Sequence, residues 1–315
     1  MSATAMVQTL PVTRDLLTGG EWCPSALREL YHLAADVKVH PERYRSALAA
    51  RSVVMIFEKP SLRTRVTFEV GIRNLGGNPI FLDQTRSRLG EREEIKDVAR
   101  NLECWVQGIV ARTFHHHALE ELAEHAAIPV INALSERFHP CQALADFFTL
   151  EERFGSLKGF EMAYLGDGNN MCHSLMLVAA RLGVHFRVAT PAGYHPDPQV
   201  VTEARRAARE TRGSIHVFTD PAEAVHGARA VYTDVWASMG QEEEAAQRAG
   251  VFEPYQVTGS LMELASPDAV FMHCLPAHRG SEVTPEVIDS ERSIIYHQAQ
   301  NRLHVQNAVL LTLLD

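Results

Sequence analysis

Short apolar runs alternate along this chain with longer segments whose apolar residues recur at helical spacing. In the first half the apolar runs, predicted as strands, are residues 52–57, 79–82, 108–111 and 129–133. The segments between and after them, predicted as helices, are residues 66–75, 93–103, 119–127 and 142–154. Strands that alternate with helices in this way indicate a parallel sheet covered on both faces.

A second series of the same kind follows the glycine-bounded stretch 155–159. Its predicted strands are residues 162–165, 184–190, 214–218, 230–233 and 269–272. Its predicted helices are residues 171–182, 199–211 and 221–226, and a last helix spans 305–314. The acidic, polar stretch 240–259 is predicted as a mobile insertion. The pattern therefore predicts an α/β protein with two doubly wound domains, divided near residue 150.

Composition narrows the class of protein. The chain has 315 residues, 46% of them apolar, so it can build two large cores. Its net charge of −9 makes nonspecific nucleic-acid binding a poor hypothesis. Its five cysteines include no CxxC pair, which argues for a reducing compartment. Neither a membrane-length apolar run nor a secretion signal is evident, and we expect a cytoplasmic protein.

Polar clusters follow several of the predicted strands at the point where each strand ends. These clusters are residues 60–65, 112–113, 139–142, 167–170, 234–240 and 273–280. Ligands of open parallel sheets bind at the carboxyl ends of the strands. Six clusters in that position predict a ligand site more strongly than any one of them does.

The cluster at 60–65 has the chemistry that a small dianion requires. It supplies two hydroxyls, two guanidiniums and a helix start with free backbone N–H groups. Pro60 fits a fixed turn before that helix. The segment taken alone is equally compatible with an ordinary capped helix that carries two surface arginines.

The other clusters also have plain structural alternatives when each is taken alone. Arg112 could be a surface charge after its strand, and His139 a cap at the start of a helix that contains Gln142. Asp234 could cap a turn, although its carboxylate could equally hold an ammonium group. Cys274 ends a buried strand and could be structural or reactive, because reactivity depends on a pKa that sequence does not give.

Two further patterns are weighed and set aside. The run Gly166-Asp167-Gly168-Asn169-Asn170 begins like a dinucleotide fingerprint, but its third glycine is absent. The tract His115-His116-His117 lacks a carboxylate or thiol at ligand spacing, and successive residues do not converge in a helix or a strand. We therefore expect no metal and no cofactor.

Four motifs together resemble the aspartate/ornithine carbamoyltransferase family. Ser61-Leu62-Arg63-Thr64-Arg65 is similar to that family's carbamoyl phosphate motif Ser-Thr-Arg-Thr-Arg, with Leu62 in place of the usual threonine. His139-Pro140-Cys141-Gln142 matches its His-Pro-x-Gln motif. Asp234-x-x-x-Ser238-Met239-Gly240 and His273-Cys274-Leu275-Pro276 match the pair that marks the ornithine branch. The resemblance extends from about residue 51 to 311.

The resemblance implies a role for each matching position. Implied to bind carbamoyl phosphate are Ser61, Leu62, Arg63, Thr64, Arg112, His139, Gln142, Cys274, Leu275 and Arg302. Implied to bind ornithine are Asn170, Asp234, Ser238 and Met239. The implied catalytic set is Arg63, Arg112, His139, Asp234 and Cys274. Family members are trimers or assemblies of trimers with shared active sites, and Arg88, in the loop 84–92, is the candidate for a contact with the neighbour's phosphate.

The implied domains are residues 1–150 for carbamoyl phosphate and 151–298 for ornithine, with 299–315 as a C-terminal helix that packs back on the first domain. The implied reaction transfers the carbamoyl group to the δ-amine of L-ornithine, giving citrulline and phosphate in arginine metabolism. Closure of the segment 238–259 over ornithine is a further expectation from the family. Open alternatives are a carbamoyltransferase for another amine, such as putrescine or an acylated ornithine, and a binding protein that has lost catalysis. A nicotinamide dehydrogenase is disfavoured by the missing glycine fingerprint.

Overall fold

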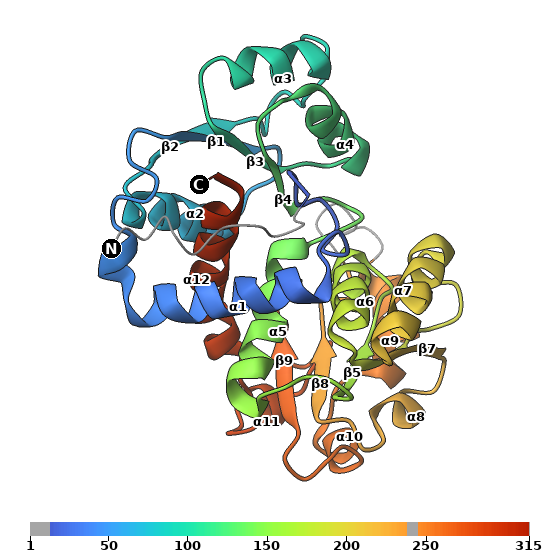
Figure 1. The fold of residues 1–315 in the computed structure, drawn as a ribbon. Coiled ribbons are helices and arrows are strands. Elements are labelled where there is room, and N and C mark those ends of the chain that lie inside the picture. The colour runs from blue at the N-terminus through green and yellow to red at the C-terminus, as the bar shows by residue number, and fades with distance from the viewer. Residues whose placement is uncertain (1–12, 238–244, 315) are drawn as a thin grey trace. The chain divides into compact units, whose positions relative to one another are not determined.

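The computed structural model describes residues 13–237 and 245–314 of the chain. The chain forms two compact units. Unit 1 contains residues 1–148 and 300–315, and unit 2 contains residues 149–299. Both units have a parallel sheet with helices packed on it (Figure 1). The fold predicted from the sequence, an α/β protein with two doubly wound domains, is confirmed.

Unit 1 is built on four parallel strands in the order β2-β1-β3-β4. The strands are β1 (Ser52–Phe57), β2 (Asn78–Asp83), β3 (Gly108–Arg112) and β4 (Val130–Leu134). Its helices are α1 (Pro24–Val39), the short 3-10 helix η2 (Pro41–Tyr44), α2 (Leu62–Asn74), α3 (Ile95–Glu103) and α4 (His116–His125). The chain leaves unit 1 within α5 (Pro140–Phe154) and returns within α12 (Ile295–Leu314).

The central strands β1 and β3 and the strand β4 of unit 1 are almost fully buried, whereas the edge strand β2 is partly exposed. Val54 and Ile56 of β1 pack with α3 and α4 in one buried cluster. In Figure 1, α3 and α4 lie on one face of this sheet, and α2 and α12 lie on the other. A side chain at Gly71 of α2 would overlap Asn307 of α12, so glycine allows these two helices to approach closely.

Unit 2 is built on five parallel strands in the order β7-β6-β5-β8-β9. The strands are β5 (Glu161–Leu165), β6 (His185–Ala189), β7 (Ser214–Phe218), β8 (Ala230–Thr233) and β9 (Val270–His273). The longer helices are α6 (Asn170–Leu182), α7 (Pro198–Thr211) and α9 (Ala245–Phe252). The shorter ones are α8 (Pro221–Val225), η4 (Glu253–Tyr255), α10 (Gly259–Glu263) and α11 (Pro285–Ile288).

The central strands β5, β8 and β9 of unit 2 are almost fully buried, whereas the edge strand β7 is partly exposed. One cluster joins β5, β8 and β9 to α8, α10 and α11, with Ala163, Val231 and Phe271 fully buried in it. Helix α6 ends at Gly183, whose φ of 74° is the left-handed conformation that glycine adopts without strain. No helix in the described part of the chain is long and apolar enough to cross a membrane.

Three predicted elements differ from the structure. Helix α2 begins at Leu62 rather than at residue 66, because the chain is already extended at Ser61 and turns into the helix directly after it. The predicted mobile insertion 240–259 is wrong over residues 245–259, which contain α9, η4 and the first residue of α10. Residues 240–244 of that prediction lie outside the described residues. Helix α12 begins at Ile295, ten residues before the predicted start and four before the predicted C-terminal segment.

Candidate functional site

The first candidate site lies where the strand order of unit 1 reverses. From β1 the chain passes to β2 on one side, and it then crosses back to β3 on the other side. The carboxyl ends of β1 and β3 therefore flank the crevice in which doubly wound sheets bind their ligands. Phe57 and Arg112 are register partners at those two ends. The side chain of Arg112, at the end of β3, contacts Ser61, which follows the end of β1.

The start of α2 brings polar groups from three segments together. Ser61 is its N-cap, but the Ser61 hydroxyl makes no capping bond and instead accepts a hydrogen bond from Arg112 Nη1 at 3.3 Å. Thr64 is buried in the first turn, and its hydroxyl accepts a hydrogen bond from Arg302 Nη2 of α12 at 2.9 Å. The N–H groups of a first helical turn have no partner within the helix and favour an anion.

Positive charge is concentrated and buried at this point. Burial, together with the charges of Arg302 and Arg63, lowers the pKa of Arg112 to about 10, so the guanidinium stays charged at neutral pH. Burial and the same arginines, with Arg112, hold the pKa of His139 well below its usual range. His139 is therefore a neutral imidazole at neutral pH, which can donate a hydrogen bond without adding another charge.

Gln142, in the first turn of α5, adds a hydrogen-bond acceptor to this group of donors. Its side chain is fully buried, and Nε2 donates to Asp146 Oδ1 at 2.7 Å. Its Oε1 is buried and has no hydrogen-bond partner among the described residues. A buried amide oxygen without a partner costs free energy, and it can accept a hydrogen bond from a ligand N–H group. Cys141 beside it is buried, and burial raises the pKa of its thiol to about 12, which makes it an inert core residue.

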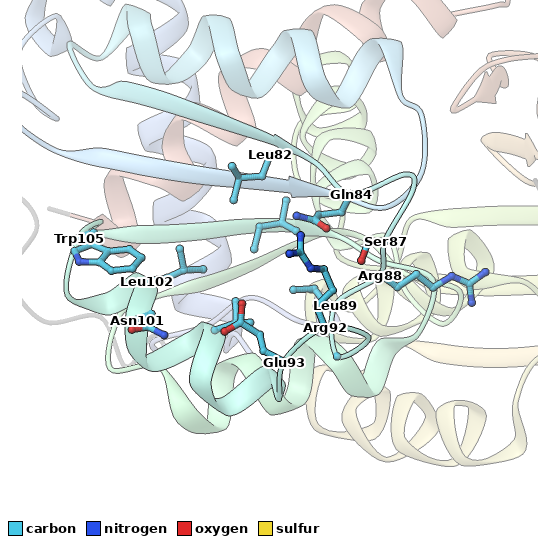
Figure 2. Close-up of a pocket in the computed structure, with 13 residues that line it drawn as sticks. Leu82, Gln84, Ser87, Arg88, Leu89, Arg92, Glu93, Asn101, Leu102 and Trp105 are labelled. Atoms are coloured by element: carbon cyan, nitrogen blue, oxygen red, sulfur yellow. The ribbon is translucent and has the colours of Figure 1, made fainter.

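Arg88 and Leu62 lie at the margin of this site. Arg88 borders a cavity of about 600 Å³ under the loop 84–92, and Figure 2 shows its guanidinium pointing away from the other labelled side chains. The guanidinium lies over the Phe114 ring, 4.1 Å from its centre, and Lys59 Nζ lies 4.4 Å from the same centre. Leu62 is 75% exposed, which is unusual for a leucine beside a polar site.

The second candidate site occupies the corresponding position in unit 2. From β5 the chain passes to β6 and β7 and then crosses to β8 on the other side, so the strand order reverses between β5 and β8. Asp234, which follows β8, accepts hydrogen bonds from Asn169 Nδ2 at 2.9 Å and from Cys274 Sγ at 3.0 Å. Its own loop contributes the Val235 N–H at 2.8 Å. A carboxylate, a thiol and an amide meet there within hydrogen-bond reach.

The loop after β5 is held by a buried ion pair. Arg248 of α9 is 7% exposed, and its Nη1 donates to Asp167 at 2.8 Å and to the Trp236 carbonyl at 2.9 Å. Burial raises the pKa of Asp167, against the opposing effect of Arg248. Tyr164 donates to Asn169 Oδ1, and burial and the nearby Asp234 charge raise its pKa well above the usual range. These contacts fix the amide that meets Asp234.

His273 holds the turn that carries Cys274. Its Nδ1 accepts the Leu275 N–H at 2.8 Å, where Leu275 has the left-handed φ of 60°. The proton therefore sits on Nε2, 3.1 Å from Glu282 Oε1. Burial alone would raise the pKa of Glu282, but the hydrogen bonds from His273 and from the His278 N–H outweigh it and the pKa is lowered.

One group in the described part of the chain has the spacing of a metal site: Asp234, His273 and Cys274 each offer an atom within 4.8 Å of the others. Both ring nitrogens of His273 are already engaged, with Leu275 and Glu282. A metal would have to break this buried network. The donor set fits internal hydrogen bonding better, and we assign no metal to it.

The structure brings the predicted residues together within each unit. In unit 1, hydrogen bonds join Arg112 to Ser61 and Arg302 to Thr64, and the charges of Arg63, Arg112 and Arg302 act on His139. Leu62 is the first residue of α2, and Gln142 lies in the first turn of α5. Unit 2 joins Asp234 to Cys274, and Leu275 follows in the same turn. Asn170 begins α6, and its neighbour Asn169 makes the contact with Asp234. Ser238 and Met239 lie outside the described residues.

Asn169 belongs to the predicted polar cluster 167–170, but the sequence did not single out Asp146 or Glu282 among the residues that orient these groups. Asp146, Asn169 and Glu282 each hold a predicted site residue through a hydrogen bond. Asp146 lies four residues after Gln142 on one helix face, so its spacing could have indicated it. Glu282 had no comparable signal, because its partner lies nine residues away across a turn.

Comparison with known proteins finds two family models that match successive parts of the chain. The family model described as "Aspartate/ornithine carbamoyltransferase, carbamoyl-P binding domain" matches residues 14–152. The model described as "Aspartate/ornithine carbamoyltransferase, Asp/Orn binding domain" matches residues 158–313. Both models span the switch points described above.

Relatives and solved structures cover nearly the whole chain. The ornithine carbamoyltransferase of Anoxybacillus flavithermus is 50% identical over 317 residues, which covers 100% of each chain. That of Thermus thermophilus is 50% identical and covers 98% of this chain and 99% of its own. The solved structure of the Pyrococcus furiosus enzyme superposes with a TM-score of 0.93 at 46% identity, over 96% of this chain and 97% of that one. The chain belongs to the aspartate/ornithine carbamoyltransferase family.

Proposed function

We propose that this protein is an ornithine carbamoyltransferase, which transfers the carbamoyl group of carbamoyl phosphate to the δ-amine of L-ornithine and releases citrulline and phosphate. The observation that carries the proposal is a pair of switch-point sites of opposite character. Unit 1 gathers Arg63, Arg112 and Arg302 around a helix start, as a phosphate requires. Unit 2 presents Asp234 beside Cys274, as an amino group requires.

Residues 1–150 form the carbamoyl phosphate domain in this proposal. Ser61, Leu62, Arg63 and Thr64 hold the phosphate with the N–H groups and side chains of the first turn of α2. Arg302 adds a forked donor, which suits phosphate geometry. The buried Gln142 Oε1 accepts a hydrogen bond from the carbamoyl NH₂ group. This oxygen has no other hydrogen-bond partner among the described residues.

Arg112 and His139 act on the carbonyl and the leaving phosphate. As the amine attacks, negative charge grows on the carbonyl oxygen and then on the departing phosphate. A fixed guanidinium and a neutral imidazole donate hydrogen bonds to that charge. One such donor lowers the activation barrier by about 2.7–4 kcal/mol. Because the pKa of His139 lies well below its usual range, the imidazole is neutral at neutral pH and can donate a hydrogen bond there.

Residues 151–298 form the ornithine domain in this proposal. Asp234, Asn170, Ser238 and Met239 hold the amino-acid part of ornithine, and Cys274 and Leu275 lie at the reacting δ-amine and the carbamoyl group. An alkyl ammonium has a pKa of about 10.4, so the site must favour the neutral amine. Desolvation favours it, and Asp234 with Cys274 can orient the amine and accept its proton.

No covalent intermediate is needed. Aligning the amine with the carbonyl can lower the activation barrier by about 7–11 kcal/mol. The hydrogen-bond donors of unit 1 lower it by several kcal/mol more. The leaving phosphate takes the final proton and balances the reaction.

We place the enzyme in the cytoplasm, in arginine metabolism. We expect a homotrimer or an assembly of trimers in which Arg88 reaches the neighbour's phosphate. The C-terminal segment 299–315 packs on the carbamoyl phosphate domain through Arg302.

A citrulline assay tests the proposal. Purified protein with carbamoyl phosphate is given L-ornithine, putrescine or N-acetylornithine, and product is measured for each amine. We expect turnover with L-ornithine to exceed the others by orders of magnitude. Faster turnover of putrescine or of the acylated amine would transfer the assignment to that substrate. Absence of any carbamoylated product would indicate a binding protein that has lost catalysis. Subunit mass in solution tests the trimer.

A further inference from the structure

A buried carboxylate lies beside the carbamoyl phosphate site without belonging to the residues that would touch the substrate. Glu58 follows the last residue of β1 and is 4% exposed. Charged side chains are rarely buried unless hydrogen bonds or opposite charges compensate them. The contacts of Glu58 therefore indicate what this charge does.

Each oxygen of the Glu58 carboxylate accepts a backbone N–H from a different loop. Oε1 accepts the Leu89 N–H at 2.8 Å, and Oε2 accepts the Phe114 N–H at 2.6 Å. The backbone N–H of Glu58 also donates to the Arg112 carbonyl at 2.9 Å. One residue thus ties together the ends of β1 and β3 and the loop 84–92.

The three tied segments all carry residues proposed for the site. The segment after Glu58 leads in three residues to Ser61. Phe114 lies two residues after Arg112, and Leu89 follows Arg88. The Arg88 guanidinium lies over the Phe114 ring at 4.1 Å, so the two loops that Glu58 joins also contact each other through side chains. A shift of either loop would move Arg88.

The charge of Glu58 also suits its surroundings. Burial and the charges of Arg112 and Arg88 lower the pKa of the Lys59 ammonium, while the charges of Glu136 and Glu58 oppose that lowering. A negative carboxylate next to this group of cations lowers the repulsion among them. With a neutral side chain of the same shape, Glu136 would remain as the other carboxylate that offsets this repulsion at Lys59.

We propose that Glu58 is a positioning residue for carbamoyl phosphate binding: its carboxylate fixes the loop 84–92 against the turn 112–114 and thereby sets the place of Arg88. The inference rests on the proposed function for its kinetic test. It assigns Glu58 no contact with substrate and no proton transfer. Its effect is expected in the binding of carbamoyl phosphate, through Arg88, and not in the use of ornithine.

The substitution Glu58→Gln removes one of the two acceptor oxygens and replaces it with an NH₂ group. Glutamine has the same shape, but its amide offers one acceptor and one donor group, so it can accept only one of the two N–H groups. A hydrogen bond to a charged group that is lost in a buried place costs enough to change binding on the order of tenfold. We expect the KM for carbamoyl phosphate to rise by about that factor, with the KM for ornithine unchanged.

A double-mutant cycle with Arg88→Ala separates positioning from general loosening. If Glu58 acts through Arg88, the rise in KM caused by Glu58→Gln becomes much smaller once Arg88 is alanine, because the group that it places is gone. Losses that multiply independently would overturn the proposal. So would a lower melting temperature with an unchanged KM, because that result identifies Glu58 as a purely structural residue.

Asp83→Asn is the matched control. Asp83 ends β2, is exposed, and accepts the Thr85 N–H at 3.0 Å at the start of the same loop. It makes no contact with the turn 112–114, so we expect the KM for carbamoyl phosphate to stay within about twofold of wild type. An equal rise in both variants would mean that any disturbance of the loop is enough, and it would overturn a specific role for Glu58.

Amide hydrogen exchange in the unaltered protein tests the geometry independently of activity. The Leu89 and Phe114 amides should exchange slowly, because both donate to a buried carboxylate. Fast exchange at both would overturn the proposal even if the variants fail to fold. Slow exchange in a protein that makes no citrulline would instead count against the proposed function and leave the role of Glu58 in the fold intact.

Discussion

The two switch-point sites have the same position in their sheets and opposite chemistry. In unit 1, Arg112 is held among Arg63 and Arg302, so like charges lie close together in a buried place. In unit 2, Asp234 already receives hydrogen bonds from Asn169, Cys274 and its own loop. The first site is assembled from cations that repel one another, and the second from groups that satisfy one another.

This difference shows how each site depends on its ligand. Repulsion among buried guanidinium groups is relieved when a dianion enters, so part of the cost of assembling unit 1 is recovered only in the bound state. In unit 2, internal hydrogen bonds among the described residues hold the Asp234 carboxylate in place. The same fold position can therefore serve a phosphate or an amine, and the side chains at the strand ends decide which.

The largest expected effect comes from Arg63→Ala, which removes one cation from the unit 1 group. Loss of one donor to the developing charge should lower kcat by about 10²- to 10³-fold. The fold should survive, because Arg63 is a partly exposed residue in the first turn of α2. Steady-state kinetics and a thermal melt measure both quantities.

Arg65→Ala is the control for that variant. Arg65 lies one residue beyond Thr64, but it stacks over Phe81 at 3.7 Å, with nearly half of its side chain exposed. We expect its kcat to stay within a few-fold of wild type. Near-normal turnover of Arg63→Ala would remove that residue from the catalytic set and weaken the contrast between the sites.

Cys274→Ala should show that unit 2 serves the amine. The variant removes the thiol that donates to Asp234 Oδ1 at 3.0 Å. A hydrogen bond to a charged group contributes about 1.5–3 kcal/mol, so kcat/KM for ornithine should fall by roughly 10- to 150-fold. Binding of carbamoyl phosphate, measured by calorimetry without ornithine, should change far less. Equal losses for both substrates would contradict the separation of roles.

The contrast between the sites was partly readable from the sequence. The strands were predicted because residues such as Val53–Met55 in β1 or Val231 in β8 are apolar on both faces, as covered parallel strands must be. The polar residues that follow those strands then marked both crevices. Arg112 was less certain from sequence alone, since an arginine at a strand end is often a surface charge, yet it is only 5% exposed.

What the sequence did not provide was contact between distant segments. Thr64 and Arg302 are 238 residues apart, and only the packing of α2 on α12 through Gly71 brings them together. The predicted start of α2 was late because the motif in its first turn is polar and gives no apolar periodicity. Helix α1 had no counterpart among the predicted elements, although Leu27, Leu30 and Ala34 bury one face of it.

Acid should distinguish the two units through a buried histidine of unit 1. Burial lowers the pKa of His116 to about 4, and its side chain is 4% exposed with Nδ1 3.0 Å from Ser135 Oγ. Between about pH 6.5 and 4 the unfolded chain binds a proton at this residue that the folded chain does not. Stability is therefore lost as the pH falls through that window.

Urea unfolding at pH 7 and pH 5 measures this effect. Between pH 6.5 and 5, keeping His116 neutral in the folded protein lowers the free energy of unfolding by roughly 2 kcal/mol. Wild type should therefore lose about that much more stability than His116→Asn. His117→Asn is the control, because His117 is exposed on the same turn of α4. If His116→Asn lost as much stability as wild type, the acid sensitivity would belong to other groups and unit 1 would not be distinguished by His116.

The smallest expected effect comes from Leu62→Thr, which restores the hydroxyl that the family motif usually has at this position of unit 1. Leu62 is 75% exposed, so its replacement should alter stability little. The Leu62 backbone N–H, at the first position of α2, is available to an anion with either side chain. The new hydroxyl adds one hydrogen bond, worth about 0.5–1.5 kcal/mol, and should lower the KM for carbamoyl phosphate by about two- to tenfold. An unchanged KM would mean that the cationic group and the helix start already supply the binding that a hydroxyl at this position could add. Unit 1 would then be a site defined by charge and backbone more than by its side-chain hydroxyls.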